Sequence, residues 1–87
     1  MSAKPKGPLE LPASNDARAV LAYNVRHLRV RRGWSQEDLA MECDLDRTYV
    51  SAVERARWNV SLANIERLAT ALERQAWQLL KPPAAAE

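Results

Sequence analysis

The stretch "SQEDLAMECDLDRTYVSAVER", residues 35–55, holds two short apolar patterns separated by an acidic break. Ser35 stands three residues before Asp38, which is the spacing of a capping box, so a helix is predicted to begin here. Asp46 can cap a second helix that is predicted to run to the end of the stretch. Asp44 lies at the break, where we expect a left-handed backbone. Helices this short are marginal alone, so packing against the rest of the chain must stabilise them.

The second of these helices, residues 46–55, has two different faces, because each residue turns the helix by about 100°. Val50 and Val53 are predicted to point inward, with Tyr49 at one edge. The outward face is short, polar and without a carboxylate, and it comprises Arg47, Thr48, Ser51, Ala52 and Arg55. Such a face suits a helix that enters a DNA groove, because phosphates line both walls of the groove. An ordinary solvated face is the alternative, and it would be expected to carry Glu or Lys.

Glu54 lies at the inward edge of the same helix, beside Val50. A buried carboxylate is costly unless it is paired. The nearest plausible donor is Arg29, at the edge of the apolar stripe of the preceding helix. We therefore predict an ion pair between Arg29 and Glu54 that fixes the angle at which the outward face is presented.

Apolar residues at helical spacing predict three further helices. The first begins near Ser14 or Asn15, either of which can cap it, and ends at Gly33. Ser61 caps the fourth, and the fifth covers about residues 75–80. Their inward faces are predicted to be made by Leu21, Val25 and Leu28 in the first and by Leu62, Ile65, Leu68, Ala69 and Leu72 in the fourth. The predicted fold class is therefore all-α, a compact five-helix bundle.

The ends of the chain differ from its middle. Residues 1–13 contain three Pro and one Gly without an apolar period, so they are predicted to form a flexible tail, as are residues 82–87. The helical domain is predicted to cover residues 14–81. No apolar run approaches the roughly 18 residues of a membrane span, and the N-terminus lacks a secretory pattern. A cytoplasmic protein is expected.

Catalysis and metal binding are not predicted. Cys43 is the only cysteine, which excludes an internal disulfide and a cysteine zinc cluster, and a buried structural thiol is the favoured role. His27 is the only imidazole, and no carboxylate pair lies in a plausible cleft. The sequence therefore predicts no enzyme, no cofactor and no metal. A domain this small has no room for a deep ligand cavity, so no small-molecule effector is expected.

The stretch "VRHLRVRRGWSQEDLAMECDLDRTYVSAVERARWNVSLANIERLATAL" resembles the helix-turn-helix domain of phage repressor and Cro-type regulators, the Xre family. The resemblance covers roughly residues 20–80. Within the family, "LDRTYVSAVER" is most similar to the controller proteins of bacterial restriction–modification systems. These are small dimers that switch transcription of their own gene and of the endonuclease gene.

The resemblance implies a lambda-repressor-like domain with a positioning helix at residues 36–43 and a recognition helix at residues 46–55. It implies contacts with base edges or adjacent phosphates by Arg47, Thr48, Tyr49, Ser51 and Ala52. It implies contacts with the DNA backbone by Gln36, Arg55, Arg57 and Asn59. The implied function is transcription regulation through sequence-specific binding to double-stranded DNA, at the bacterial or phage nucleoid. An antitoxin-type or other protein-interaction module of a two-gene system is the alternative.

A homodimer is expected, because one recognition helix makes too few contacts for tight specific binding and two-fold symmetry doubles them on a palindrome. The apolar residues near the C-terminus exceed what so small a core can cover, and those predicted for the interface are Leu72, Trp77, Leu79 and Leu80. For Trp77 and Leu80 the alternative is that they close the core of a single chain.

The sequence departs from the family pattern at several positions. Asp44 replaces a turn glycine, and Val60 replaces a proline before the fourth helix. The segment "ERQAW" lacks the glycine that usually ends this helix, so the fourth and fifth helices could run together. Trp58 could stack on a sugar or pack on the protein's own core. Ala52 can offer only its methyl group, for example to a thymine.

Overall fold

The computed structural model describes residues 10–84, and these residues form five helices. The helices are α1 (Ala17–Arg31), α2 (Gln36–Cys43), α3 (Arg47–Glu54), α4 (Leu62–Ala71) and α5 (Ala76–Leu79). The predicted all-α, five-helix architecture is therefore confirmed. Most of the predicted tail at residues 1–13, and the end of the one at residues 82–87, lie outside the described residues.

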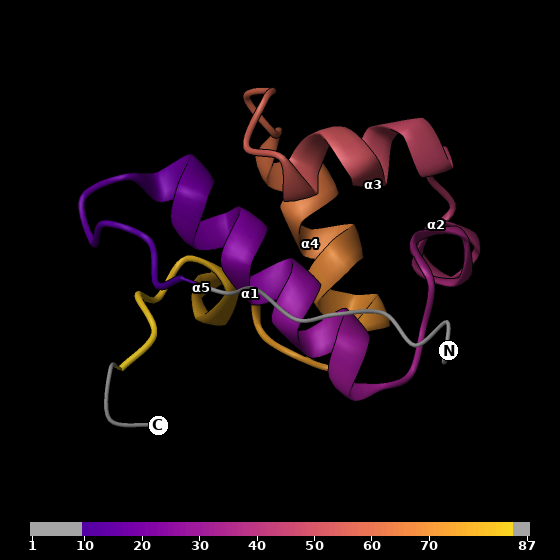
Figure 1. Cartoon of the computed structure of the whole chain (residues 1–87). Helices are drawn as coiled ribbons and strands as arrows, with labels where there is room; N and C mark the ends of the chain where they lie inside the picture. Colours follow the sequence, from indigo (N-terminus) through magenta and orange to yellow (C-terminus); the bar gives the residue numbers. More distant parts are fainter. Residues whose placement is uncertain (1–9, 85–87) are drawn as a thin grey trace.

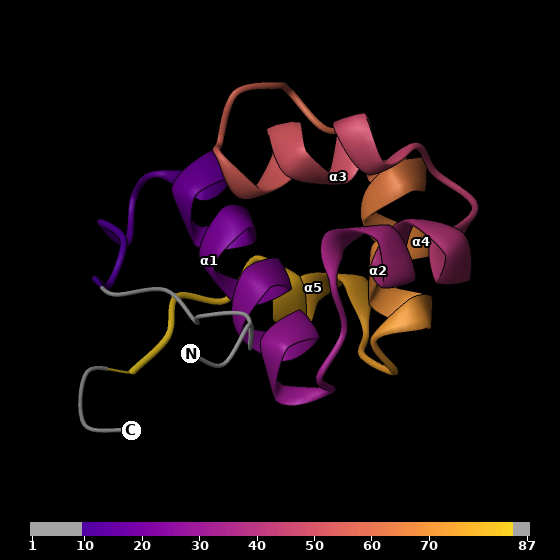
Figure 2. The same cartoon turned by 45° about the vertical axis from the view of Figure 1, so that its right-hand side comes forward.

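The helices pack so that α3 is left uncovered on one side. In two views α3 forms the upper edge of the molecule, while α5 lies below it, beyond α1 (Figure 1, Figure 2). The main contacts of α3 are made with α1 and α2, and α5 packs against α1 and α4. The outward side of α3 and the surface around α5 therefore belong to different sides of the domain.

Two helix starts follow their local sequence signals. The Ser35 hydroxyl accepts a 3.0 Å hydrogen bond from the Asp38 N–H, and the Asp38 carboxylate accepts one of 2.8 Å from the Ser35 N–H. This is the predicted capping box of α2. The Ser61 hydroxyl accepts from the Asn64 N–H at 3.1 Å and caps α4.

Two other predicted caps are wrong. The carboxylate of Asp16, and neither Ser14 nor Asn15, accepts a 3.0 Å hydrogen bond from the Ala19 N–H and caps α1. An N-cap side chain accepts from the second or third N–H of its helix, and Asp16 is the N-cap residue because α1 begins at Ala17. Asp46 occupies the N-cap position of α3, but its side chain makes no capping hydrogen bond.

Residues with a left-handed backbone separate the helices. Gly33 has φ 72° after α1, and Asp44 has φ 57° between α2 and α3, as predicted. Glu73 has φ 58° directly after α4. A left-handed residue ends an α-helix, so α4 and α5 are separate and the alternative that they run together is wrong. The chain therefore turns here without the usual glycine.

The core receives side chains from every helix. Its fully buried members include Val25, Leu39, Val50, Val53, Leu68, Leu72 and Leu79. The prediction that Leu72 and Leu79 belong to a dimer interface is therefore wrong, because both are enclosed within one chain. The prediction that Leu62 faces inward is also wrong, since Leu62 is 75% exposed where α4 begins, at the edge of the core.

No helix in residues 10–84 has the length and apolar character required to span a bilayer.

Candidate nucleic-acid interface

A buried ion pair fixes α3 against α1. Arg29 Nε donates to Glu54 Oε2 at 2.6 Å, and Arg29 Nη2 donates to Glu54 Oε1 at 2.9 Å. The two side chains are only 6% and 3% exposed. Arg29 Nη1 also donates to the Trp34 carbonyl at 2.8 Å, so the guanidinium is held at both ends. The predicted pairing is present, and its two parallel hydrogen bonds set the orientation of α3.

The same carboxylate positions the start of α2. Gln36 Nε2 donates to Glu54 Oε1 at 3.1 Å. Gln36 is the residue from which the sequence predicts a phosphate contact. Because an amide nitrogen carries two hydrogens, one side chain can hold Glu54 and also donate to a phosphate. The buried pair thereby joins α1, α3 and the first residue of α2 through hydrogen bonds to one carboxylate.

The outward face of α3 is narrower than the sequence predicted. Arg47, Thr48 and Arg55 are exposed and Ser51 is half-buried. Ala52 is only 3% exposed, so its predicted outward orientation is wrong. The reason is that α3 packs against both α1 and α2, which covers a wider sector of the helix than the stripe of two valines implies.

Tyr49 lies at the rim between this face and the core. Asn64 Nδ2 donates to the Tyr49 hydroxyl at 2.9 Å, which ties α3 to α4. The Tyr49 ring also contacts the Trp58 ring edge to face, with centroids 5.3 Å apart and an interplanar angle of 63°. The structure thus places Tyr49 in a contact with the connection between α3 and α4.

Several exposed arginines without a carboxylate partner lie on this side. In the described part of the chain, the arginines that enter no ion pair and no side-chain hydrogen bond include Arg18, Arg47, Arg55 and Arg57. By contrast, Arg29 and Arg32 pair with Glu54 and Glu73, respectively. Asn59 is exposed in the same connection as Arg57. Cations left unpaired at a surface make an attractive field for an anionic partner.

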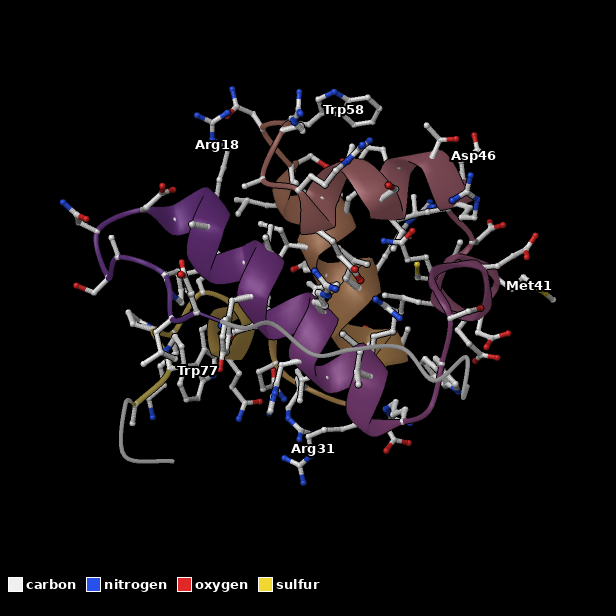
Figure 3. All side chains as sticks on the ribbon, viewed as in Figure 1. Arg18, Arg31, Met41, Asp46, Trp58 and Trp77 are labelled. Atoms are coloured by element: carbon white, nitrogen blue, oxygen red, sulfur yellow. The ribbon has the colours of Figure 1, made fainter. Side chains whose placement is uncertain are left out.

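Arg18 was not among the residues predicted from the sequence. Its side chain rises from the start of α1 on the side of the molecule where Trp58 and Asp46 also project (Figure 3). A signal was present in the sequence: a cation in the first turn opposes the helix macrodipole, and α1 has no acidic residue there. Because this charge does not stabilise α1, it indicates that Arg18 interacts with something other than its own helix.

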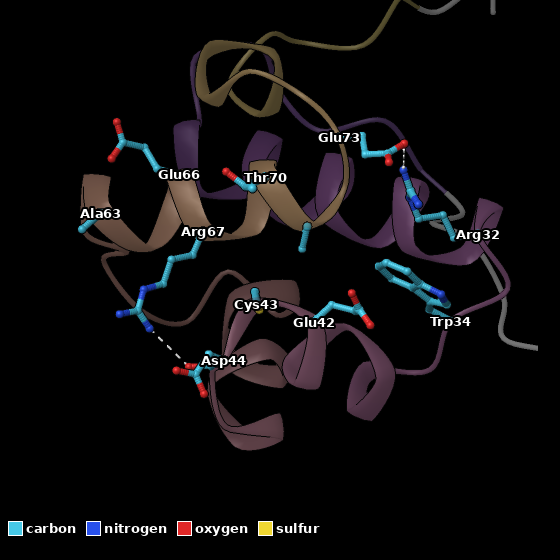
Figure 4. Close-up of a pocket in the computed structure, with 11 residues that line it drawn as sticks. Arg32, Trp34, Glu42, Cys43, Asp44, Ala63, Glu66, Arg67, Thr70 and Glu73 are labelled. Atoms are coloured by element: carbon cyan, nitrogen blue, oxygen red, sulfur yellow. Dashed lines mark hydrogen bonds and ion pairs between the residues drawn. The ribbon is translucent and has the colours of Figure 1, made fainter.

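A groove between α2 and α4 is lined by none of these arginines (Figure 4). It has a volume of about 730 Å³. Both of its arginines are engaged: Arg32 pairs with Glu73 at 2.9 Å, and Arg67 Nη1 donates to the Asp44 carbonyl at 3.2 Å. Cys43 is buried beside the groove, and burial raises the pKa of its thiol. Cys43 therefore has the surroundings of a structural thiol.

The surface around α5 carries exposed apolar side chains. Trp77 is 61% exposed and Leu80 is 37% exposed, and the nearby Leu11 is also exposed. Trp77, Leu11 and the two prolines after α5 line a groove of about 630 Å³. Trp77 therefore does not close the core of a single chain. It lies on the side of the molecule away from Trp58 (Figure 3).

Comparison with known proteins agrees with this geometry. The family model described as a helix-turn-helix domain matches residues 20–77. A hypothetical transcription factor from Neisseria meningitidis is 66% identical over 76 residues, covering 87% of this chain and 72% of the relative. The crystal structure of hypothetical transcription factor NHTF from Neisseria superposes with a TM-score of 0.89 and 64% identity, over 92% of each chain.

Several other relatives are controller proteins. Control protein C.BamHI of Bacillus amyloliquefaciens is 47% identical over 68 residues, covering 77% of this chain and 84% of the relative. C.Esp1396I, solved as a tetramer in complex with its natural 35 base-pair operator, superposes with a TM-score of 0.67 and 30% identity over 74% of this chain and 88% of that one.

The chain belongs to the helix-turn-helix family. Within that family its relatives are transcription factors and restriction–modification controller proteins. The family resemblance seen in the sequence is thereby confirmed.

Proposed function

We propose that this protein regulates transcription by binding a palindromic operator as a symmetric dimer, and that it controls its own gene within a restriction–modification system. The observation that carries the proposal is the uncovered side of α3, where exposed arginines have no carboxylate partner. A buried bidentate ion pair holds α3 in its orientation. A relative of the same fold is known in complex with its operator.

In this proposal α3 enters the major groove and its first turn contacts base edges. Arg47 is placed where its two-pronged guanidinium can donate to O6 and N7 of a guanine. Thr48, Ser51 and the ring of Tyr49 add contacts with neighbouring base edges or phosphates. Ala52 is left out of this set, because it is buried.

The remaining polar residues hold the DNA backbone. Gln36 lies at the start of α2, while Arg55, Arg57 and Asn59 lie at the end of α3 and just beyond it. Arg18 extends the same basic surface along the start of α1. Contacts with phosphates set the register of the protein on the duplex without choosing a sequence.

The proposed dimer forms through α5. Trp77 and Leu80 offer apolar surface that one chain leaves exposed, and a two-fold axis brings the same patch of two copies together. Because this surface and the outward side of α3 lie on different sides of the domain (Figure 1), dimerisation leaves both copies of α3 accessible. A palindrome with two half-sites is the matching target.

The test compares two duplexes, one carrying the DNA that precedes the gene and one of mixed sequence. Arg47→Ala should weaken binding to the first duplex by about 1–3 kcal/mol and flatten the preference at one base pair per half-site. Arg67→Ala is the matched control, because it removes the same charge from the groove between α2 and α4. Equal losses on both duplexes would make Arg47 a phosphate contact. A wild-type protein that binds neither duplex at low salt refutes the proposed function.

A further inference from the structure

Trp58 is a large apolar side chain that lies exposed on the side of the molecule proposed to face DNA. It lies in the connection between α3 and α4, between two exposed polar residues, Arg57 and Asn59. Its side chain is 45% exposed. It projects on the side of the molecule to which Arg18 also points (Figure 3). Burial would ordinarily be favourable for an indole, so this exposure calls for an explanation.

The backbone around Trp58 is fixed by hydrogen bonds. Ala56 adopts a left-handed conformation with φ 55°. The Ala56 N–H donates to the Val53 carbonyl at 3.0 Å, and the Arg57 N–H donates to the Ala52 carbonyl at 3.0 Å. These two bonds close the end of α3 and direct the chain toward Trp58. The indole is therefore carried by a defined turn.

The ring itself is also held in place. Tyr49 contacts it edge to face at a centroid distance of 5.3 Å. Tyr49 is in turn held by Asn64 on α4, at 2.9 Å. One edge of the indole is thus supported by α3 and α4, while much of its remaining surface faces outward. Ordering a side chain before binding lowers the entropy lost on binding.

We propose that Trp58 contacts the sugar–phosphate backbone of the DNA beside Arg57, with its face on deoxyribose and its Nε1–H available to a phosphate oxygen. An indole has an apolar face and one donor, and it carries no charge. The contact is therefore independent of base sequence and displaces no counterion. This inference deepens the proposed function and rests on it, because it requires that the outward side of α3 binds duplex DNA.

The experiment measures the dissociation constant of the full-length protein for a mixed-sequence duplex as a function of salt. Trp58→Ala should weaken binding by at least about fivefold and leave the slope against salt unchanged, since no charge is removed. Arg57→Ala, measured in parallel, should lower that slope by about one per subunit. Met41→Ala is the control for an exposed apolar side chain, because Met41 is on α2 and points away from Trp58 (Figure 3). It should leave the affinity unchanged.

A spectroscopic readout keeps the inference testable if Trp58→Ala folds poorly. Trp58→Phe preserves an aromatic ring against Tyr49, and Trp34 and Trp77 remain in this variant. The difference in emission between wild type and Trp58→Phe reports on Trp58 alone, and it should change when the duplex is added. If this emission difference is the same with and without saturating DNA, the inference is overturned.

Two further outcomes overturn the inference and leave the proposed function standing. In one, Trp58→Ala binds DNA as tightly as wild type while Arg57→Ala binds more weakly. In the other, the loss appears only on duplexes long enough for two dimers, which would make Trp58 a contact between neighbouring proteins. Absence of wild-type binding at low salt would instead defeat the proposed function itself.

Discussion

Replacing Glu54 with alanine should strongly destabilise the protein, because it leaves the Arg29 guanidinium buried without its counter-ion. Glu54 accepts three hydrogen bonds, of 2.6, 2.9 and 3.1 Å, and its side chain is 3% exposed. Hydrogen bonds to charged groups contribute about 1.5–3 kcal/mol each, which sets an upper limit of about 9 kcal/mol. Arg29 keeps its bond to the Trp34 carbonyl. The expected loss is therefore about 3–5 kcal/mol, as for other broken buried pairs.

Such a loss is a large part of the whole stability. A chain of 87 residues is expected to be stable by about 4–13 kcal/mol. Urea unfolding of wild type and Glu54→Ala at one fixed protein concentration measures the difference, since dimerisation adds to the apparent stability. In a thermal scan the same loss should lower Tm by roughly 12–40 °C, at about 4–8 °C per kcal/mol.

A double variant separates the charge from the packing. Arg29→Met with Glu54→Leu removes both charges and fills the space with apolar groups, so it should be within about 2 kcal/mol of wild type. It also removes the acceptor that positions Gln36, so its DNA binding should weaken even though it is folded. A loss below about 1 kcal/mol in Glu54→Ala would refute the argument. A double variant as unstable as Glu54→Ala would attribute the cost to packing.

Three other outcomes are expected. Arg57→Ala, and likewise Arg18→Ala, should weaken binding to operator and mixed-sequence duplexes equally and lower the salt slope by about one per subunit; a change confined to the operator would contradict this. Trp77→Ala or Leu80→Ala should shift the protein toward monomer in sedimentation and weaken operator binding, whereas a wild-type monomer with full affinity would exclude the α5 interface. Burial holds the pKa of Cys43 above its ordinary value of 9.0, which favours the protonated thiol in the folded state. In urea unfolding, the free energy of unfolding should therefore fall as pH rises above that value. Cys43→Ala should lack the part of this fall that Cys43 causes.

Features that depend on spacing along the chain could be predicted from the sequence. The capping box of Ser35 and Asp38 requires two side chains three residues apart, and the structure contains it. The left-handed turn at Asp44 follows from an apolar pattern broken at one residue. The pairing of Arg29 with Glu54 was predictable as well, because a carboxylate on an inward edge requires a donor and few donors lie on an apolar stripe.

The extent of burial was decided only by the tertiary structure. Helical periodicity gives the direction in which a side chain points, but the sector of a helix that becomes covered depends on how many other segments pack against it. Ala52 is buried because α3 packs mainly against two helices, α1 and α2, and Leu62 is exposed because α4 begins at the edge of the core. The same reason separates Leu79, which is enclosed within one chain, from Trp77, which remains exposed at the surface.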